Sequence, residues 1–350
     1  MGWQEERMIP IWTGDTVYEE SVMFIGGADG RIRPAPLIYQ ADKVLKVSAV
    51  DRKTVYREGE DYALEDGMLV RLPDSRIPAW SYEEFYMTES ASIAINSRTE
   101  QNKFIRFDTG DVYAAHQALV TYTHQDSWGG VVPVYQGEIL HRTADLLRNR
   151  RPMKIVYYGD SITAGWDASS MWNIEPYAPQ LSELVTMELK ACWGYEEIEE
   201  VNTAVGGTDS AWGLAEIEER VCAHRPDLVV LGFGMNDGGG VNPRRYEANV
   251  REMIRKVRKA MPETEFLLIA TMLPNPDGLG WTCFQPMYQW NLKKIAAQTP
   301  GVAVAPMTDV SEYILSQKNF EHVTGNGINH PNDFLVRVYA QVIAASLVKG

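Results

Sequence analysis

The sequence predicts a two-part chain, with an all-β half of the sandwich or jelly-roll type followed by an α/β half built on a doubly wound parallel sheet. The first observation is a change of hydrophobic period near residue 150. Short segments rich in Val, Ile and Tyr precede this point, and strands alternating with helices follow it. The second is the length of 350 residues, which at about 150 residues per domain leaves room for two domains. We expect a β domain over residues 1–138, a connector over residues 139–151 and an α/β domain over residues 152–350.

The N-terminal half contains short apolar segments separated by turn signals. The intervening pieces GGADG, EDG, LPDS and DTGD are rich in Gly and Asp, which permit the backbone angles of tight turns. Asp66-Gly67 is the clearest hairpin signal, because this dipeptide favours a two-residue turn between antiparallel strands. The predicted strands are residues 21–26, 43–50, 54–59, 68–72, 103–110 and 118–124.

The C-terminal half begins after a helical connector over residues 139–148 and a charged stretch, RNRRP, that ends in proline. Its first strand, KIVYY over residues 154–158, is almost continuously apolar, as expected for a strand covered on both faces. Further strands are predicted over residues 198–202, 228–232, 266–270 and 302–305, and helices over residues 181–193, 246–261 and 333–347. Such sheets bind ligands at the carboxyl ends of their strands, so the loops after the strands are the places to look for chemistry.

The charge balance limits the classes of partner. With 33 basic and 47 acidic residues the net charge is −14, which argues against nucleic acid and against an anionic membrane surface. The chain is 45% apolar, too hydrophobic for disorder, and its apolar runs are far shorter than a membrane-spanning helix needs. We expect no nucleic-acid or membrane partner.

Three widely spaced cysteines, Cys192, Cys222 and Cys283, form neither a disulfide framework nor a metal knuckle. They are expected to be small buried residues in a reducing compartment. The N-terminal stretch MGWQEERMIPIW lacks the basic region and apolar run of a signal peptide. A cytoplasmic location is therefore expected.

The loop after the first C-terminal strand reads GDSITAG over residues 159–165 and contains Ser161. A serine in a glycine-bracketed turn before a helix is well placed to expose its hydroxyl, although the same pattern fits an N-cap serine. Thr163 occupies the last glycine position of G-x-S-x-G, which disfavours the nucleophile elbow of α/β-hydrolases.

The loops after the second and third strands supply hydrogen-bond donors. Residues 202–208 read NTAVGGT and residues 232–237 read GFGMND, so Gly207 offers an approachable N–H and Asn236 a side-chain amide. Together these are the parts of an oxyanion hole, while each alone also fits an ordinary turn.

His330 is distinguished from the other five histidines by its place in a loop, GINHPND, that leads into the last helix. A histidine there could act as the general base that takes the proton of a serine hydroxyl. A structural histidine is the competing interpretation.

Taken in order, GDSITAG, the glycine loop ending at Gly207, GMND and NHP resemble the four sequence blocks of the SGNH (GDSL) hydrolases. The resemblance spans residues 152–350 and implies a flavodoxin-like, three-layer α/β fold. It implies that Ser161 is the nucleophile and His330 the catalytic histidine. It further implies that the N–H groups of Ser161 and Gly207 and the Asn236 amide form the oxyanion hole, with no cofactor and no metal.

The sequence departs from the family at the acid. The family usually carries Asp in a D-x-x-H pattern, whereas Gly327 stands there and the neighbouring Asn326 cannot carry a charge. Asp333 is a candidate acid, although a carboxylate in the first turn of a helix also complements the helix dipole. The alternatives are a backbone carbonyl that holds the His330 ring or an acid supplied from elsewhere in the chain.

A β domain ahead of an SGNH domain resembles the layout of acetyl esterases of carbohydrate esterase family 2. This resemblance implies deacetylation of an acetylated small molecule or oligosaccharide. Aromatic side chains that could stack on sugars, or simply fill the core, are Trp80, Tyr82, Phe85, Tyr86, Trp128, Trp166, Trp172, Trp281 and Trp290. The alternatives are a thioesterase or lysophospholipase-type acylhydrolase, and a non-catalytic carbohydrate-binding SGNH protein.

Overall fold

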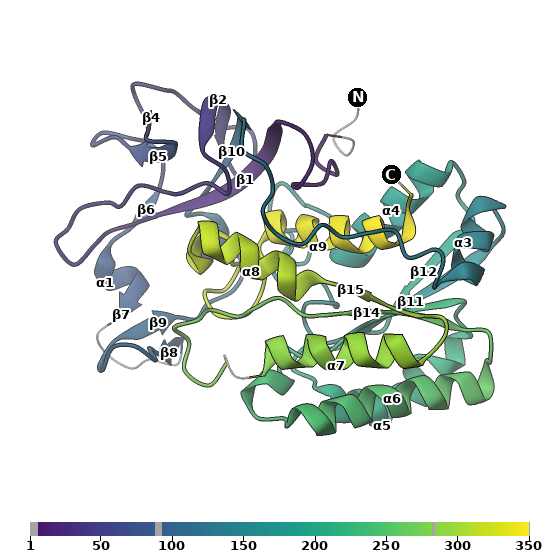
Figure 1. The fold of residues 1–350 in the computed structure, drawn as a ribbon. Helices are drawn as coiled ribbons and strands as arrows, with labels where there is room; N and C mark the ends of the chain where they lie inside the picture. The colour runs from purple at the N-terminus through teal and green to yellow at the C-terminus, as the bar shows by residue number, and fades with distance from the viewer. Residues whose placement is uncertain (1–5, 88–92, 282–283, 350) are drawn as a thin grey trace.

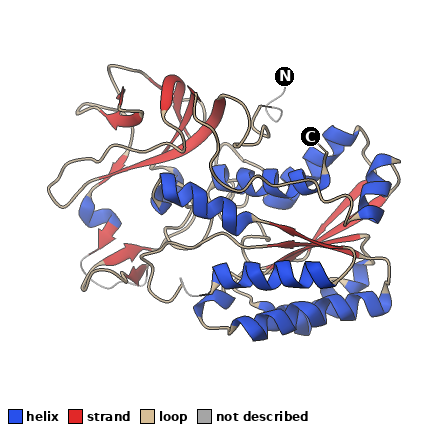
Figure 2. Ribbon diagram, viewed as in Figure 1, coloured by secondary structure: helices blue, strands red, loops and turns tan. Residues whose placement is uncertain are grey.

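The structure, a computed structural model, describes residues 6–87, 93–281 and 284–349. It consists of a β-rich N-terminal region packed against a layered α/β region, as Figures 1 and 2 show. The predicted fold class is confirmed.

The C-terminal region contains a parallel sheet in the order β12-β11-β13-β14-β15. This 2-1-3-4-5 order along the chain is that of flavodoxin-like folds. Its strands are β11 (Met153–Gly159), β12 (Ile198–Asn202), β13 (Leu228–Gly232), β14 (Glu265–Ile269) and β15 (Val302–Ala305). All of these strands lie within two residues of the predicted positions.

Helices cover both faces of this sheet (Figure 1). They are α3 (His141–Arg148), α4 (Leu181–Trp193), α5 (Ser210–Arg220), α6 (Pro243–Ala260), α7 (Gln285–Gln298), α8 (Met307–Gln317) and α9 (Asp333–Leu347). The alternation along β11 explains the layers. Ile155 and Tyr157 pack in one apolar cluster with residues of α4, α8 and α9, and Val156 and Tyr158 pack in another with residues of α5, α6 and α7.

Capping residues set the ends of several helices. The Asn242 side chain accepts from Arg244 N and Pro243 occupies the first turn, so α6 begins three residues before its predicted start. Helix α9 begins as predicted, because the Asn332 side chain accepts from Leu335 N.

The N-terminal region contains a five-stranded sheet in the order β3-β2-β10-β1-β6. Two smaller units, the hairpin β4-β5 and the sheet β7-β9-β8, accompany it. The strands are β1 (Thr16–Ile25), β2 (Ala41–Ala49), β3 (Val55–Tyr56), β4 (Tyr62–Glu65), β5 (Met68–Arg71), β6 (Ala79–Trp80), β7 (Tyr86–Met87), β8 (Ala94–Asn96), β9 (Phe104–Arg106) and β10 (Gln117–His124); α1 (Tyr82–Phe85) and α2 (Asp111–Ala114) are short. The hairpin turn at Asp66-Gly67 is confirmed, since both residues have positive φ, as a type I′ turn requires.

The two regions share one apolar core. Val22 and Phe24 of β1 belong to the same cluster as Phe334 and Leu335 of α9. The domain limits at residues 138 and 152 stay a prediction, since the core runs through both regions.

Two further observations concern the whole chain. In the described part, no helix combines the length and apolar character needed to cross a bilayer. Cys192 is exposed and Cys222 half-buried, so the expectation of buried cysteines is wrong for these two, and Cys283 lies outside the described residues. The thiols of Cys192 and Cys222 are free.

Candidate active site

Ser161 lies in a tight turn directly after β11. The carboxylate of buried Asp160 shapes this turn by accepting from Ile162 N at 3.1 Å and from Met235 N, after β13, at 3.4 Å. Burial raises the pKa of Asp160 to about 7. Gly159 is required at the end of β11, because a Cβ there would lie 2.1 Å from the carbonyl oxygen of Gly232.

Ser161, His330 and Asp167 form a buried chain of hydrogen bonds. The Ser161 Oγ lies 2.8 Å from His330 Nε2, and Asp167 Oδ2 lies 2.6 Å from His330 Nδ1. Because a carboxylate can only accept, Nδ1 carries the proton and Nε2 of the neutral ring is left to accept from the serine. This is the arrangement that a histidine needs to act as a base toward a serine hydroxyl.

The carboxylate on the histidine is therefore Asp167 and not Asp333, the candidate taken from the sequence. Asp333 Oδ1 accepts from the backbone N–H of Ser169 at 2.8 Å. Asp167 lies six residues after Ser161, in the same loop, and its Oδ1 accepts from Trp172 Nε1 at 3.0 Å. The alternative of an acid supplied from elsewhere in the chain is the one that this geometry favours.

Close packing around Gly327 explains why the family's usual acid position carries no carboxylate in this chain. Its φ is +86°, and a Cβ would lie 2.1 Å from Tyr113 Oη and 2.3 Å from the Arg106 carbonyl oxygen. Both neighbours belong to the N-terminal region, which therefore packs too closely on the histidine loop for any side chain at this position.

Asn326 holds the histidine loop in shape in place of a charged group. Its Oδ1 accepts from the backbone N–H groups of Ile328, Asn329 and His330 at 3.0, 3.0 and 3.1 Å. One buried amide oxygen thus organises the backbone that presents the imidazole.

The predicted oxyanion donors lie at the ends of β11, β12 and β13. Within the described ranges, the N–H groups of Ser161 and Gly207 donate to no protein acceptor. Asn236 Nδ2 donates one hydrogen to the Thr208 carbonyl oxygen at 2.8 Å, which orients the amide and leaves its second hydrogen for a ligand. Donors held in this way can stabilise charge that develops on a carbonyl oxygen.

Asp237, next to Asn236, supports this part of the site. It is fully buried and accepts from the backbone N–H and the hydroxyl of Ser210, at the start of α5. Burial raises its pKa to about 6. In the GMND block, Asn236 thus supplies a hydrogen-bond donor to the site, and Asp237 binds the first residue of α5.

Trp166 and Trp172 are the predicted aromatic residues that lie beside the His330–Asp167 pair, Trp166 against the imidazole and Trp172 on the carboxylate. The Trp166 ring stands edge-on to the His330 ring, with centroids 5.9 Å apart, and its centroid is 6.0 Å from that of Trp172. Trp166 also lies against Gly206, where a Cβ would approach the indole to 2.9 Å.

The other predicted aromatic residues lie elsewhere. Trp80, Phe85 and Tyr86 pack in or against an apolar cluster of the N-terminal region, and the Tyr82 ring lies tilted against that of Tyr86. Trp128 packs on Trp12 and Tyr313. Trp281 contacts Phe107, and Trp290 is exposed on α7.

Among the described side chains there is no group of three or more His, Cys, Asp or Glu that could hold a metal ion.

A flavodoxin-like sheet that carries a Ser-His-Asp chain at the carboxyl ends of its strands defines the class: the arrangement is that of a serine hydrolase. Comparison with known sequences gives the family. Residues 157–334 match the GDSL-like Lipase/Acylhydrolase family, and the chain belongs to it.

Two curated relatives match part of the chain. An arylesterase of Vibrio mimicus is 28% identical over 106 residues, which cover 30% of this chain and 48% of the relative. Esterase TesA of Pseudomonas aeruginosa is 32% identical over 123 residues, which cover 34% of this chain and 55% of the relative. The chain thus spans about half the length of the curated relatives it matches.

Solved structures with a similar arrangement include a two-domain esterase, CEX, active on acetylated mannans. It has a TM-score of 0.47 at 19% identity, and the match covers 61% of this chain and 54% of that one. Another is the acetylxylan esterase Axe2 of Geobacillus stearothermophilus, with a TM-score of 0.46 at 19% identity, covering 57% of this chain and 97% of that one.

Proposed function

We propose that the protein is a serine esterase that hydrolyses carboxylic esters through Ser161 and His330. The observation that carries the proposal is the continuous chain of hydrogen bonds from Ser161 Oγ through the imidazole to Asp167. The two curated relatives, an arylesterase and an esterase, support the same reaction class.

The geometry suggests two-step acyl transfer. Ser161 Oγ attacks the ester carbonyl while His330 Nε2 takes its proton, and Asp167 stabilises the imidazolium through Nδ1–H. The negative charge on the carbonyl oxygen is stabilised by the N–H groups of Ser161 and Gly207 and by the Asn236 amide. His330 then protonates the leaving alcohol, and water hydrolyses the acyl-enzyme with the same histidine as base.

We propose a short acyl group, acetyl, as the part of the substrate that is transferred. Trp166 lies against both the His330 ring and Gly206. Gly206 is the residue directly before Gly207, the proposed oxyanion donor. A rigid indole at this place limits the room beside the carbonyl carbon, which favours an acyl group with few carbons.

We propose an acylated carbohydrate as the alcohol part of the substrate. Trp172 is exposed beside Trp166, and a flat indole face at the edge of the site is suited to a sugar ring. The excess of acidic residues is consistent with a neutral substrate rather than an anionic one. The cytoplasmic location stays a prediction.

The test is a substrate panel with the wild type and Ser161→Ala. We expect turnover of p-nitrophenyl acetate and acetylated xylo-oligosaccharides, with loss of turnover by about 10³-fold or more in the variant. A preference for long-chain acyl esters or thioesters would move the assignment to a lipid or thioester acylhydrolase. Full activity of Ser161→Ala would overturn the mechanism, and binding of oligosaccharides without turnover would favour a carbohydrate-binding protein.

A further inference from the structure

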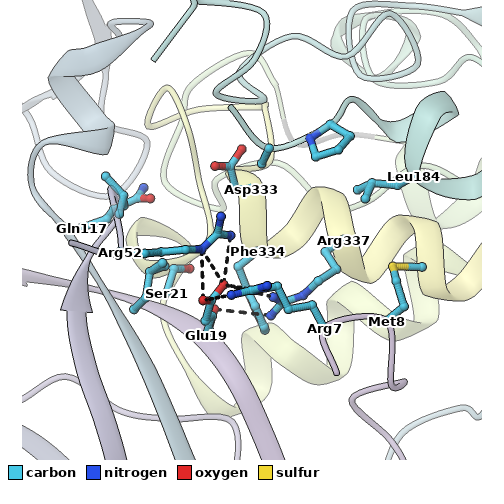
Figure 3. A pocket seen from close by; sticks show the side chains of 14 residues that line it. Arg7, Met8, Glu19, Ser21, Arg52, Gln117, Leu184, Asp333, Phe334 and Arg337 are labelled. Atoms are coloured by element: carbon cyan, nitrogen blue, oxygen red, sulfur yellow. Dashed lines mark hydrogen bonds and ion pairs between the residues drawn. The ribbon is translucent and has the colours of Figure 1, made fainter. Parts of the chain in front are cut away.

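A buried charged cluster lies between the N-terminal sheet and α9. Glu19 of β1 is its centre (Figure 3). Its carboxylate contacts Arg7 at 2.6 Å, Arg52 at 2.9 Å and Arg337 at 3.9 Å. Glu19 lies within a register shift of β1, between Val17 and Glu20, and has a φ of +48°, in the left-handed region that non-glycine residues rarely adopt.

Asp333 lines the same cavity as Glu19 and is half-buried there (Figure 3). Burial raises its pKa, and the charges of Arg52 and Arg337 counteract this effect. The proposed reaction does not use this carboxylate, and a charged group partly withdrawn from water needs hydrogen-bond partners.

Those hydrogen bonds go to Ser169. Asp333 Oδ1 accepts from Ser169 N at 2.8 Å, while the Ser169 hydroxyl oxygen accepts from Ala178 N at 2.8 Å. Ser169 is therefore fixed on both sides, by the first residue of α9 and by the far end of its own loop.

Ser169 is two residues from Asp167, whose φ of +66° lies in the left-handed region that non-glycine residues rarely adopt. Asp333 is three residues from His330. The two loops are thus joined at two points, by Asp167 to His330 at 2.6 Å and by Asp333 to Ser169 at 2.8 Å. The contact between Asp333 and Ser169 thus lies two residues from the left-handed backbone of Asp167, the residue whose side chain contacts His330.

The alternative role of Asp333, complementing the dipole of α9, does not require this contact. The cap of α9 is already formed by Asn332, whose side chain accepts from Leu335 N at 3.1 Å. Asp333 Oδ1 instead points across to the neighbouring loop.

We propose that Asp333 is a positioning residue that holds Asp167 against His330 Nδ1 through the Ser169 N–H. The proposal rests on the proposed function. In this proposal the effect of Asp333 depends on where its acceptor oxygen lies and not on the charge of its side chain.

Three variants separate position from charge. Asp333→Asn keeps an acceptor oxygen at the same place, Asp333→Glu keeps the charge but moves it by one methylene, and Asp333→Ala removes both. With p-nitrophenyl acetate we expect Asp333→Ala and Asp333→Glu to lose about 10²-fold in kcat with KM unchanged, since a small misplacement of a catalytic group has costs of this size. Asp333→Asn should recover most of the kcat lost in Asp333→Ala.

The opposite order, with Asp333→Glu active and Asp333→Asn as impaired as Asp333→Ala, would overturn the proposal in favour of a dipole role. Where only Asp333→Asn folds, a kcat as low as that of Asp167→Ala would overturn it equally. Thermal unfolding of each variant identifies those that fold.

A double-mutant cycle provides the readout that a merely structural role would not change. In an Asp167→Ala background, Asp333→Ala should have no further effect on kcat, because the group that it positions is gone. Full additivity of the two losses would contradict the proposal. Failure of the proposed function is recognised separately, since the wild type would then show no ester turnover or Ser161→Ala would keep it.

Discussion

Asp167 is the residue on which the candidate site departs most from its family pattern. The sequence offers no local signal for it, because it is one carboxylate among many and its distance of six residues from Ser161 matches no familiar spacing. By contrast, Ser161, Gly207, Asn236 and His330 could be predicted, since each lies in a motif at the end of a strand or the start of a helix. What the sequence could not reveal is that the two loops meet.

Replacing Asp167 by Asn tests its assignment. The change preserves shape but removes the charge, and the new amide can donate to Nδ1, so that the ring takes the wrong tautomer. We expect kcat to fall by about 10³- to 10⁴-fold with little change in thermal stability, measured with p-nitrophenyl acetate and by thermal unfolding. Equal activity of wild type and Asp167→Asn would show that another group orients the imidazole.

At the scale of elements, the strands of the parallel sheet and the helices α4, α6 and α9 could be predicted from their apolar periodicity. Helices α5 and α7 were not predicted, because polar residues and glycine interrupt the apolar residues of their buried faces. Ser210 and Gly213 are buried on α5, and Gln285 and Gln289 on α7. Ser210 donates to Asp237 and Gln289 donates to Asp309, and the local sequence pattern does not encode these partners.

The histidine loop gives a prediction at this scale. Restoring the family pattern by Gly327→Asp should fail, since the new Cβ would meet Tyr113 Oη and the Arg106 carbonyl at a backbone angle unsuited to non-glycine residues. We expect a stability loss of more than about 2 kcal/mol, measured by denaturant unfolding, and loss of esterase activity.

Gly30 provides the matched control. It has a similar φ of +76°, but a Cβ there meets nothing within 4 Å. Gly30→Asp should therefore cost only the backbone strain, and an equal loss in both variants would contradict the steric explanation.

At the scale of the whole molecule, the N-terminal region packs directly against the α/β region, including the loop that carries His330. Lys318 of the α/β region is fully buried in an ion pair with Glu20 of β1, and Lys318 Nζ also donates to the Ser21 carbonyl at 2.8 Å. Two acidic residues, Glu19 and Glu20, are buried in β1, and acidic residues are not expected in a buried strand. The predicted start of this strand, residue 21, is therefore five residues late. Partners about 300 positions away along the chain cannot be read from a local pattern.

The Glu19 cluster predicts how stability depends on pH. Burial alone would raise the pKa of Glu19, but the hydrogen bond from Arg7 and the charges of Arg52, Arg337 and Arg7 lower it to about 2 from a usual 4.5. A lowered pKa means that the ionised group stabilises the fold above about pH 4.5, and that this contribution is lost as the pH falls toward 2. It amounts to about 3 kcal/mol.

Glu19→Gln should therefore lower the free energy of unfolding at neutral pH and flatten its decline between pH 4.5 and 2, as followed by urea unfolding across this range. Glu252, an exposed carboxylate paired with Arg255 on α6, is the control, and Glu252→Gln should have a far smaller effect. Identical pH profiles of Glu19→Gln and wild type would show that the cluster does not link the two regions energetically.

The most direct test of Ser161 as the nucleophile is covalent labelling of the intact chain with a fluorophosphonate, followed by peptide mass spectrometry. A serine made nucleophilic by its histidine reacts with this reagent, whereas an ordinary serine does not. We expect a single adduct on Ser161, abolished by Ser161→Ala and slowed by Asp167→Asn. Ester hydrolysis without an adduct on Ser161, or an adduct at another serine, would contradict it.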